Sequence, residues 1–420
     1  MALVKEFKAV RFTENAGKIE EIVCPPYDII SPEEKEAYLK ANENNIIKLE
    51  APEQTEAGYQ GAKAELEKRF KNGVMAEDRN PALYIYEEEF EVEGKRYSFK
   101  GVTAYVKLHE FSEGIILPHE HTLSKAKTDR LNLLKTTGCS FSQIYSLYTD
   151  TDGKIPVAIA ALSSGAPDTE FTDTEGVTHR LWIAEKSAET EALCRLFDDK
   201  KLYIADGHHR YETALNYRRY VKEIGDSNEN AEYIMMFLVD MENDGLVVFP
   251  THRIIFGLDN FDSAELLKKC AEDFEVTKSD ENVEKALKEE YEKGNAAFGY
   301  FDGKEYYLLK LKNRAILDKK LGFMGEALRN LDVTVLHSLI LEGVLGIDKE
   351  NLANQINLNY TRSTAEAVEK VKAGSNCCFI LNPTRVSEIA DVARAGDTMP
   401  QKSTYFYPKL ITGLVVNKVK

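Results

Sequence analysis

Hydrophobic and polar positions along the chain follow two different periods, which predicts a mixture of strands and helices. Strict alternation in ALYIYEEEFEV and RYSFKGVTAYVKL, on either side of Glu93-Gly94, predicts a long antiparallel hairpin. A second hairpin is expected in FGYFDGKEYYLLKL, with its turn at Asp302-Gly303. Further strands are expected at residues 19–23, in HRLWIAEK, KLYIAD, YIMMFLVDM, GLVVFPTHRII and CCFILN, and at the C-terminus.

Apolar residues spaced three and four apart predict helices between these strands. One helix should start at Ser31, because Ser31, Pro32 and Glu34 together make a capping box with proline at the first helical position. The other helices are expected at residues 56–72, 124–136, 189–197, 208–225, 334–345 and 384–396, and as two amphipathic helices around FEVTK within 263–293.

These elements predict an α+β protein of two domains. Frequent hairpins argue against a single uniform parallel sheet, and no repeat or low-complexity linker separates the parts. We place the boundary near Leu258, which gives one α+β domain over 1–257 and a second over 258–420.

Composition and charge narrow the classes of function. Of the 420 residues, 43% are hydrophobic and 30% charged, as in a globular protein with a core. The net charge of −16 disfavours nucleic acid and anionic membranes as partners. The N-terminus has no apolar signal-peptide core and no segment has about 18 consecutive apolar residues, so we expect a cytoplasmic protein.

Six scattered cysteines form no disulfide or metal framework and are interpreted as reduced core thiols. Cys24 beside Pro25 is a possible nucleophile by residue type, but a buried structural thiol is favoured because nothing nearby would lower its pKa.

The segment KLYIADGHHRYETAL carries the strongest chemical signal. A buried strand ends at Asp206, Gly207 allows a sharp turn, and a helix starts with His208, His209 and Arg210. Cations at a helix N-terminus oppose the helix dipole, whereas the free amides there attract anions. An anion such as phosphate would resolve this conflict, with Arg210 as a bidentate donor. The structural alternative is that Asp206 neutralises Arg210 and the histidines cap neighbouring carbonyls.

The motifs of this chain resemble those of two known groups of proteins. ADGHHRYETAL, with VCPPYDII, HEHTLSKAKTDRL, PTHRI and MPQKSTYFYPK, resembles the family catalogued as domain of unknown function 1015 over nearly the whole chain. DGHHR is also similar, over a few residues, to the phosphate-binding signature of the ParB and sulfiredoxin superfamily, which includes free-serine kinases. The second resemblance implies a ParB/sulfiredoxin-like core with hairpin insertions, and a nucleotide-phosphate loop at Gly207, His208, His209 and Arg210.

Other motifs supply further candidates. HEHTLSKAKTDRL contributes Glu120 as a candidate catalytic carboxylate, and Lys125 and Arg130 as candidate phosphate ligands. A surface ion pair between Lys125 and Asp129 is the structural alternative. PTHRI offers His252 and Arg253 as anion donors, with a purely structural role equally open. KSTYFYPK adds Lys402, Ser403 and Thr404 as candidate nucleotide contacts, although it is not a Walker motif.

The leading hypothesis is a phosphotransferase that uses ATP or ADP with Mg²⁺ and a small hydroxyl-bearing metabolite. Its candidate catalytic residues are Asp206, His208, His209 and Glu120, and Asp28 is a further carboxylate. One alternative is a nucleotide-responsive regulator without turnover. Another is a metallohydrolase built from His119, His121, His208, His209 or His252, although the spacing of these histidines predicts no metal site. The sequence leaves open whether the protein forms a homo-oligomer.

Overall fold

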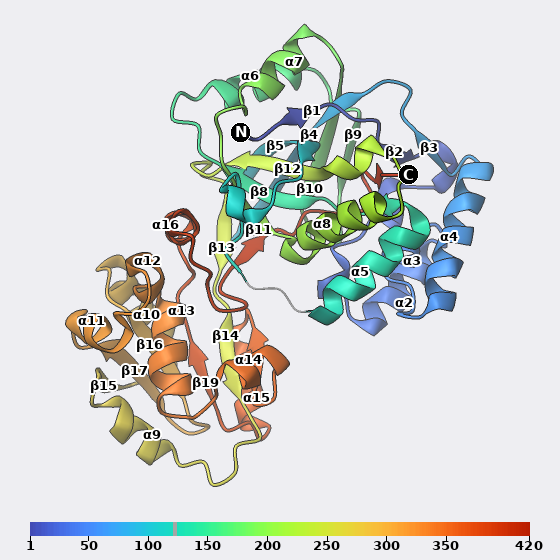
Figure 1. Cartoon of the computed structure of the whole chain (residues 1–420). Helices are drawn as coiled ribbons and strands as arrows, with labels where there is room; N and C mark the ends of the chain where they lie inside the picture. Colours follow the sequence, from blue (N-terminus) through green and yellow to red (C-terminus); the bar gives the residue numbers. More distant parts are fainter. Residues whose placement is uncertain (121–123) are drawn as a thin grey trace. The chain divides into compact units, whose positions relative to one another are not determined.

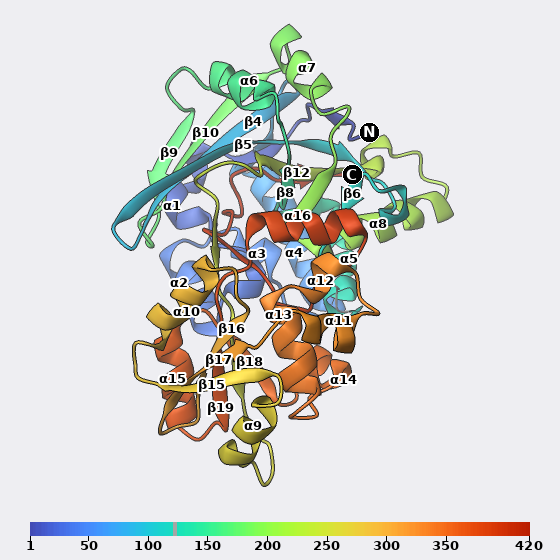
Figure 2. The same cartoon turned by 90° about the vertical axis from the view of Figure 1, so that its left-hand side faces the viewer.

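The long hairpin predicted from the alternating positions lies at the centre of the largest sheet. Strands β4 (Ala82–Val92) and β5 (Lys95–Lys107) pair antiparallel around Glu93-Gly94, as Figure 2 shows. The computed structural model describes residues 1–120 and 124–420, the side chains of 124–126 and 353 excepted. The mixed α and β architecture expected from the sequence is confirmed.

Two compact units divide the chain. Unit 1 contains Met1–Pro118, Thr122–Leu246 and Pro408–Lys420, and unit 2 contains His119–His121 and Val247–Tyr407. The sequence prediction placed a single boundary near Leu258. The chain crosses between the units after Leu246 and returns to unit 1 after Tyr407.

The main sheet of unit 1 mixes parallel and antiparallel pairs. Its strand order is β6-β11-β8-β12-β5-β4-β10-β9, and β1 (Val4–Lys5) pairs with β5. Strand β11 is parallel to β6 and antiparallel to β8, whereas β8 and β12 are parallel. The strands not yet bounded are β6 (Ile116–Leu117), β8 (Ile144–Tyr148), β9 (Thr169–Thr172), β10 (Thr178–Glu185), β11 (Leu202–Asp206) and β12 (Tyr233–Asp240).

Helix α8 (His208–Glu223) follows β11 directly and is held by its apolar face. Tyr211 and Ala214 pack into the main core of the sheet, and Tyr217 and Val221 pack with Leu134 of helix α5 (Ser124–Thr137). The two helices lie side by side (Figure 1). This apolar face does not continue to Ile224, which lies at the C-cap and is 52% exposed.

The remaining helices of unit 1 cover the rest of the sheet and the N-terminal region. Ser31 caps α2 in the predicted capping box, with Glu34 N–H donating to Ser31 Oγ and Ser31 N–H to Glu34 Oε2. These helices are α1 (Ile19–Ile22), α2 (Pro32–Ala41), α3 (Ile47–Glu50), α4 (Glu56–Lys71), α6 (Lys154–Leu162) and α7 (Ala188–Arg195).

Unit 2 is built on an antiparallel sheet of order β15-β17-β16-β19-β14-β18. The predicted second hairpin forms its β16 and β17, and a separate pair joins β13 to β20. The strands are β13 (Val247–Phe249), β14 (His252–Ile255), β15 (Phe274–Ser279), β16 (Ala297–Phe301), β17 (Tyr306–Leu311), β18 (Leu358–Thr361), β19 (Cys377–Ile380) and β20 (Tyr405–Tyr407).

The helices of unit 2 include one unusual element, a π-helix at Leu336–Glu342 that continues α13 (Asp332–Val335). The others are α9 (Ser263–Cys270), α10 (Val283–Glu292), α11 (Ala315–Leu321), α12 (Glu326–Arg329), α14 (Lys349–Asn354), α15 (Thr364–Lys372) and α16 (Val386–Ala395).

One local prediction was wrong, and two predicted helices form with different ends. Residues 19–22 form α1 rather than a strand, because Ile19, Ile22 and Val23 have the spacing of one helical face. The helix predicted over 334–345 begins at Asp332 and widens into the π-helix. Helix α16 begins after Arg385 rather than at Thr384, since Arg385 N–H donates to Glu388 Oε2.

The cysteine prediction is confirmed: all six thiols are free and buried. Burial raises the pKa of Cys24 well above its ordinary value, and the charge of Glu50 raises it further. Within the described residues, the helices are too short or too polar to cross a membrane.

Candidate functional site

The candidate site of unit 1 is organised around the junction of β11 and α8. Gly207 takes φ +94°, in the left-handed region that favours glycine, and so turns the strand into the helix. A Cβ at this position would lie 3.0 Å from both Nε and Nη2 of Arg210. Gly207 is therefore required both for the turn and for the close approach of the Arg210 guanidinium to the backbone.

Asp206 lies between two cations. Its Oδ2 accepts from Arg210 Nη2 at 2.7 Å, and its Oδ1 accepts from Lys409 Nζ at 2.8 Å. Burial alone would raise the pKa of Asp206, but Lys409 and Arg210 hold it well below its usual range, with a further contribution from His208. The carboxylate is thus ionised, and the group of Asp206, Arg210 and Lys409 has an excess of one positive charge.

This arrangement contains the ion pair between Asp206 and Arg210 that the structural alternative predicts, and it adds a second cation, Lys409. Arg210 does pair with Asp206, and its Nη1 donates to the carbonyl of Gln143. The second cation, Lys409, leaves positive charge at the helix start, where the dipole disfavours it. The first turn of α8 contains no acidic residue and its N-cap makes no side-chain hydrogen bond.

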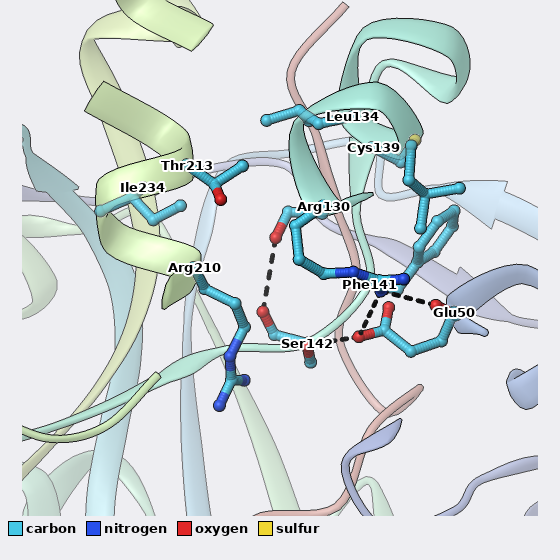
Figure 3. Close-up of a pocket in the computed structure, with 11 residues that line it drawn as sticks. Glu50, Arg130, Leu134, Cys139, Phe141, Ser142, Arg210, Thr213 and Ile234 are labelled. Carbon is cyan, nitrogen blue, oxygen red and sulfur yellow. Dashed lines mark hydrogen bonds and ion pairs between the residues drawn. The ribbon is translucent and has the colours of Figure 1, made fainter. Parts of the chain in front are cut away.

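A second buried charge cluster surrounds Arg130 (Figure 3). Arg130 donates to Asp129 Oδ2 through Nε and Nη2, at 2.9 and 2.7 Å, and to the carbonyl of Glu50 through Nη1. Its Nη1 also lies 3.6 Å from Glu50 Oε1. The guanidinium stacks on Tyr27, 4.1 Å from the ring centroid. Asp129 accepts in turn from the Tyr59 hydroxyl at 2.7 Å. The predicted ion pair with Lys125 lies outside the described side chains.

Glu50 and Asp206 have opposite electrostatic character. Burial raises the pKa of Glu50, although Arg130, a hydrogen bond from Ser142 and the charge of Arg210 oppose the rise. Glu50 is 2% exposed. It is therefore a buried carboxyl whose affinity for a proton is increased, whereas Asp206 is held ionised.

A small cavity connects the two clusters. Glu50, Arg130, Ser142, Arg210 and Thr213 line a space of about 30 Å³ (Figure 3). That volume exceeds the roughly 10–15 Å³ that a cavity needs to hold one water molecule. The buried Thr213 hydroxyl has no hydrogen-bond partner among the described residues. The cavity can therefore admit one oxygen-sized group between two guanidinium side chains.

Four sequence motifs meet in this part of unit 1. VCPPYDII supplies Tyr27, HEHTLSKAKTDRL supplies Arg130, ADGHHR supplies Asp206 and Arg210, and MPQKSTYFYPK supplies Lys409. The ionisation of Tyr27 is affected by both Arg130 and Arg210, which indicates that the clusters act on one another. Of the other predicted residues here, His208 is buried and His209 is partly exposed, and the side chain of Lys125 lies outside the described residues.

Of the remaining predicted residues, Asp28 is exposed in unit 1, and the others belong to unit 2. Glu120 accepts from the Lys402 amide at 2.5 Å, and Arg253 Nη2 donates to the Lys402 carbonyl at 3.1 Å. His119 Nε2 lies 3.1 Å from Thr404 Oγ1, and the Ser403 hydroxyl donates to the Pro400 carbonyl.

His252 lies in the core of unit 2. Its Nδ1 accepts from the Leu381 amide, and its Nε2 lies 3.1 Å from Thr364 Oγ1. Burial lowers the pKa of His252 to about 4, with Arg253 adding to the effect. These contacts favour the structural alternative for His252.

No group of three or more histidine, cysteine or acidic side chains suited to a metal ion occurs among the described residues, and His121 lies outside them. The metallohydrolase alternative therefore gains no support from the described residues.

Sequence reasoning missed Glu50, Lys409, Tyr27 and Thr213 as site residues. Lys409 and Tyr27 belong to quoted motifs, but nothing in a linear motif tells which side chain faces the helix start. Glu50 had a usable signal, since it is the lone carboxylate after the apolar run of IIKLE and precedes Ala51-Pro52. Thr213 is one helical turn after His209 and could have been placed beside Arg210.

These features define an α+β protein with a basic helix start next to a buried carboxyl. The chain belongs to the family described as "Protein of unknown function (DUF1015)", which matches residues 4–334. Comparison with curated proteins gives no match.

Solved structures with a similar chain path include a conserved hypothetical protein from Pyrococcus furiosus, with a TM-score of 0.35 and 15% identity, over 73% of this chain and 90% of that one. A free serine kinase in complex with AMP matches with a TM-score of 0.35 and 15% identity, over 73% and 86%. SbnI with a C-terminal truncation, from Staphylococcus aureus, matches with a TM-score of 0.38 and 11% identity, over 75% and 87%. These likenesses are too distant to transfer an activity.

Proposed function

We propose that this protein is a phosphotransferase that binds the phosphate groups of ATP or ADP at the start of α8. The observation that carries the proposal is the excess positive charge at that helix start, where Arg210 and Lys409 share the single carboxylate of Asp206. An anionic ligand would remove the unfavourable interaction of this charge with the helix dipole and would accept from the first-turn amides.

The proposed roles follow from the charges of the two clusters. Arg210, Lys409 and the amides after Gly207 would hold phosphate oxygens, and Asp206 would position both cations. Arg130 already has carboxylate partners, so it would act mainly by holding Glu50 and Asp129 in place. A nucleotide would supply the transferable phosphoryl group, and Mg²⁺ commonly accompanies it.

Glu50 is the best candidate for the general base. A base for an acceptor hydroxyl works best with a pKa near the working pH, and burial shifts the pKa of Glu50 toward that range. The 30 Å³ cavity beside Glu50 is large enough for one hydroxyl group. Asp206 is less suited to this role, because its neighbouring cations lower its pKa and so weaken it as a proton acceptor. The histidines His208 and His209 stay candidates for hydrogen bonds to the phosphates.

The nucleotide and the small hydroxyl-bearing acceptor are inferred differently from the anion site. They come from the similarity of DGHHR to the ParB and sulfiredoxin superfamily, while the anion site comes from the residues themselves. The nucleotide-responsive regulator uses the same site and differs only in forming no product.

The direct test is calorimetric titration of the full chain with ATP and ADP, with and without Mg²⁺. Arg210→Ala should weaken binding by about 1.5–3 kcal/mol, the usual worth of a charged hydrogen-bond donor. Asp206 keeps Lys409 as a partner in that variant, so the fold should persist. Arg219→Ala is the matched control, since Arg219 lies on the same helix but is exposed and pairs with Glu110.

Unchanged affinity in Arg210→Ala would refute the phosphate site. If both nucleotides bind and Arg210→Ala weakens them, chromatographic detection of phosphorylated product in a screen of hydroxyl-bearing metabolites separates the two remaining functions. Product that disappears in Glu50→Gln supports the transferase, whereas tight binding without product supports the regulator.

A further inference from the structure

Unit 2 contains a cavity of about 300 Å³, ten times the volume of the one beside Arg210. This is the lower end of the range of small-molecule sites. Its apolar wall is formed by Met324, Leu328, Leu352, Met399 and Pro400. A space of this size with a largely apolar wall is suited to the body of a small organic molecule.

The π-helix forms the polar side of the cavity. His337, Ser338 and Glu342 all line the space and lie on Leu336–Glu342. In a π-helix each amide bonds to the carbonyl five residues earlier, rather than four residues earlier as in an α-helix. This spacing brings positions 337, 338 and 342 to one face. π-helical turns are rare and frequently occur at functional sites, because the wider turn is less stable than an α-helix.

Two residues that line the cavity have hydroxyl groups without a hydrogen-bond partner among the described residues. Thr334 is 2% exposed, and its Oγ1 has no hydrogen-bond partner within the described chain. The same holds for the Tyr360 hydroxyl, which is buried although the ring is partly exposed. Both residues line the cavity. Buried polar groups are nearly always hydrogen-bonded, so two in one cavity indicate a partner supplied from elsewhere.

Behind these groups lies a buried cation without a carboxylate partner. Arg253 is 1% exposed, and among the described residues no carboxylate forms an ion pair with its guanidinium. Its bonds go to neutral acceptors: Nε donates to His337 Nε2 at 3.2 Å, Nη2 to the Lys402 carbonyl, and Nη1 to the Thr251 carbonyl. The guanidinium also lies 5.3 Å from the centroid of the Tyr360 ring. Glu120 is the acidic group that acts on Arg253 from further away.

His337 contacts Arg253 and also lines the cavity. Burial lowers the pKa of His337 well below its ordinary value, and Arg253 lowers it further, so the ring is neutral. Because Nε2 accepts from Arg253, the ring proton is on Nδ1, and the ring can donate a hydrogen bond only through Nδ1. At the rim, the exposed side chains of Glu342 and Lys349 carry opposite charges and balance each other.

We propose that this cavity binds a small carboxylic acid with an apolar body, at a second site separate from the one in unit 1. The carboxylate would accept from Tyr360, Thr334 and His337, close to the positive charge of Arg253, and its carbon chain would pack on the methionine and leucine wall. A monoanion matches the single uncompensated cation, whereas a phosphate dianion would leave one negative charge buried without a partner.

The test is calorimetric titration of the full chain with hexanoate, octanoate, 4-phenylbutyrate and indole-3-acetate, and with the primary amides of the same four acids. One or more of the acids should bind with 1:1 stoichiometry, and its amide should bind at least tenfold more weakly. Failure of all four acids to bind, or equal affinity of an acid and its amide, overturns the proposal.

Two substitutions test the unpartnered hydroxyls without removing an existing hydrogen bond. Tyr360→Phe and Thr334→Val should each weaken binding of the acid at least threefold, while the unfolding temperature without ligand stays the same or rises. Tyr300→Phe is the matched control: the Tyr300 hydroxyl donates to Ser263 Oγ at 2.9 Å, so this variant should lose stability and bind the acid normally. Unchanged binding in both Tyr360→Phe and Thr334→Val overturns the proposed contacts.

A cavity-filling variant and a variant in unit 1 complete the design. Leu328→Trp should abolish binding of the acid, and normal binding in this variant would remove the cavity as the site. Arg210→Ala should bind the acid normally and Tyr360→Phe should bind nucleotide normally. The two proposals can therefore fail independently.

Discussion

Replacing Gly207 by alanine separates the two reasons for glycine at the start of α8. At φ +94° an L-residue is strained by roughly 1–2 kcal/mol. The added Cβ would also lie 3.0 Å from Arg210 Nε and Nη2, so the guanidinium must move by a few tenths of an ångström. That movement strains the 2.7 Å bond to Asp206, and a charged hydrogen bond is worth about 1.5–3 kcal/mol.

The glycine at the other end of the same helix provides the control. Gly225 also has a positive φ, +69°, but nothing lies within 4 Å of a Cβ placed there. Gly225→Ala should therefore cost about 1 kcal/mol of unfolding free energy, from backbone strain alone. Gly207→Ala should cost about 2–3 kcal/mol, from strain plus partial loss of the Arg210 bond.

Scanning calorimetry of the full chain measures the difference in stability between the two variants. For domains of this size, each kcal/mol should change the melting temperature by about 2–4 °C. Titration with ADP should show about tenfold weaker binding for Gly207→Ala and unchanged binding for Gly225→Ala, since tenfold corresponds to about 1.4 kcal/mol. Equal melting temperatures and equal affinities in the two variants would refute the argument that Gly207 makes room for Arg210.

Three further predictions concern other parts of unit 1. Burial lowers the pKa of His179, but hydrogen bonds and charges from Asp173 and Glu88 raise it to about 9. Protonated His179 should therefore stabilise the fold by about 3 kcal/mol. This stabilisation is complete below pH 6.5 and is lost as the pH rises through 9. NMR titration of labelled histidine checks this, and a pKa at or below 6.5 would contradict it. Ser31→Ala should lower the unfolding free energy by about 1 kcal/mol through loss of the α2 capping box. Ser31→Thr should retain most of this stabilisation, because threonine can also cap the helix. Equal denaturation midpoints for the two variants would contradict the role of the cap. Cys24 should not react with iodoacetamide at pH 8 until urea unfolds the chain, because burial raises its thiol pKa, and rapid labelling of the native protein would show this assignment to be wrong.

Local features of the fold were predictable because neighbouring residues determine them. The hairpin turns at Glu93-Gly94 and Asp302-Gly303 and the Ser31 capping box depend on a few adjacent residues, and all three form. The stretch after Lys18 was misassigned because three apolar residues, Ile19, Ile22 and Val23, are too short a pattern to distinguish a helix from a strand, although their spacing is that of one helical face. The π-helix was missed because its extra residue per turn leaves no mark in the apolar pattern.

The candidate site was predictable only as separate motifs. The basic helix start follows from Gly207 to Arg210 alone, since strand, glycine and helix are adjacent. The meeting of Tyr27, Arg130 and Lys409 near this helix depends on contacts between residues far apart in the chain, and a single sequence does not specify them. The burial of Glu50, which makes it the better base candidate than Asp206, likewise depends on packing against Arg130 and Ser142.

Titration of ADP into Lys409→Met, beside the wild type and Lys420→Met, tests the phosphate site most directly. Both lysines lie in the C-terminal segment of unit 1, and each pairs with an aspartate at 2.8 Å, Lys409 with Asp206 and Lys420 with Asp226. If the excess charge at the start of α8 binds phosphate, Lys409→Met should weaken ADP binding about tenfold or more and Lys420→Met should leave it unchanged. Equal affinity in all three proteins would contradict the phosphate site.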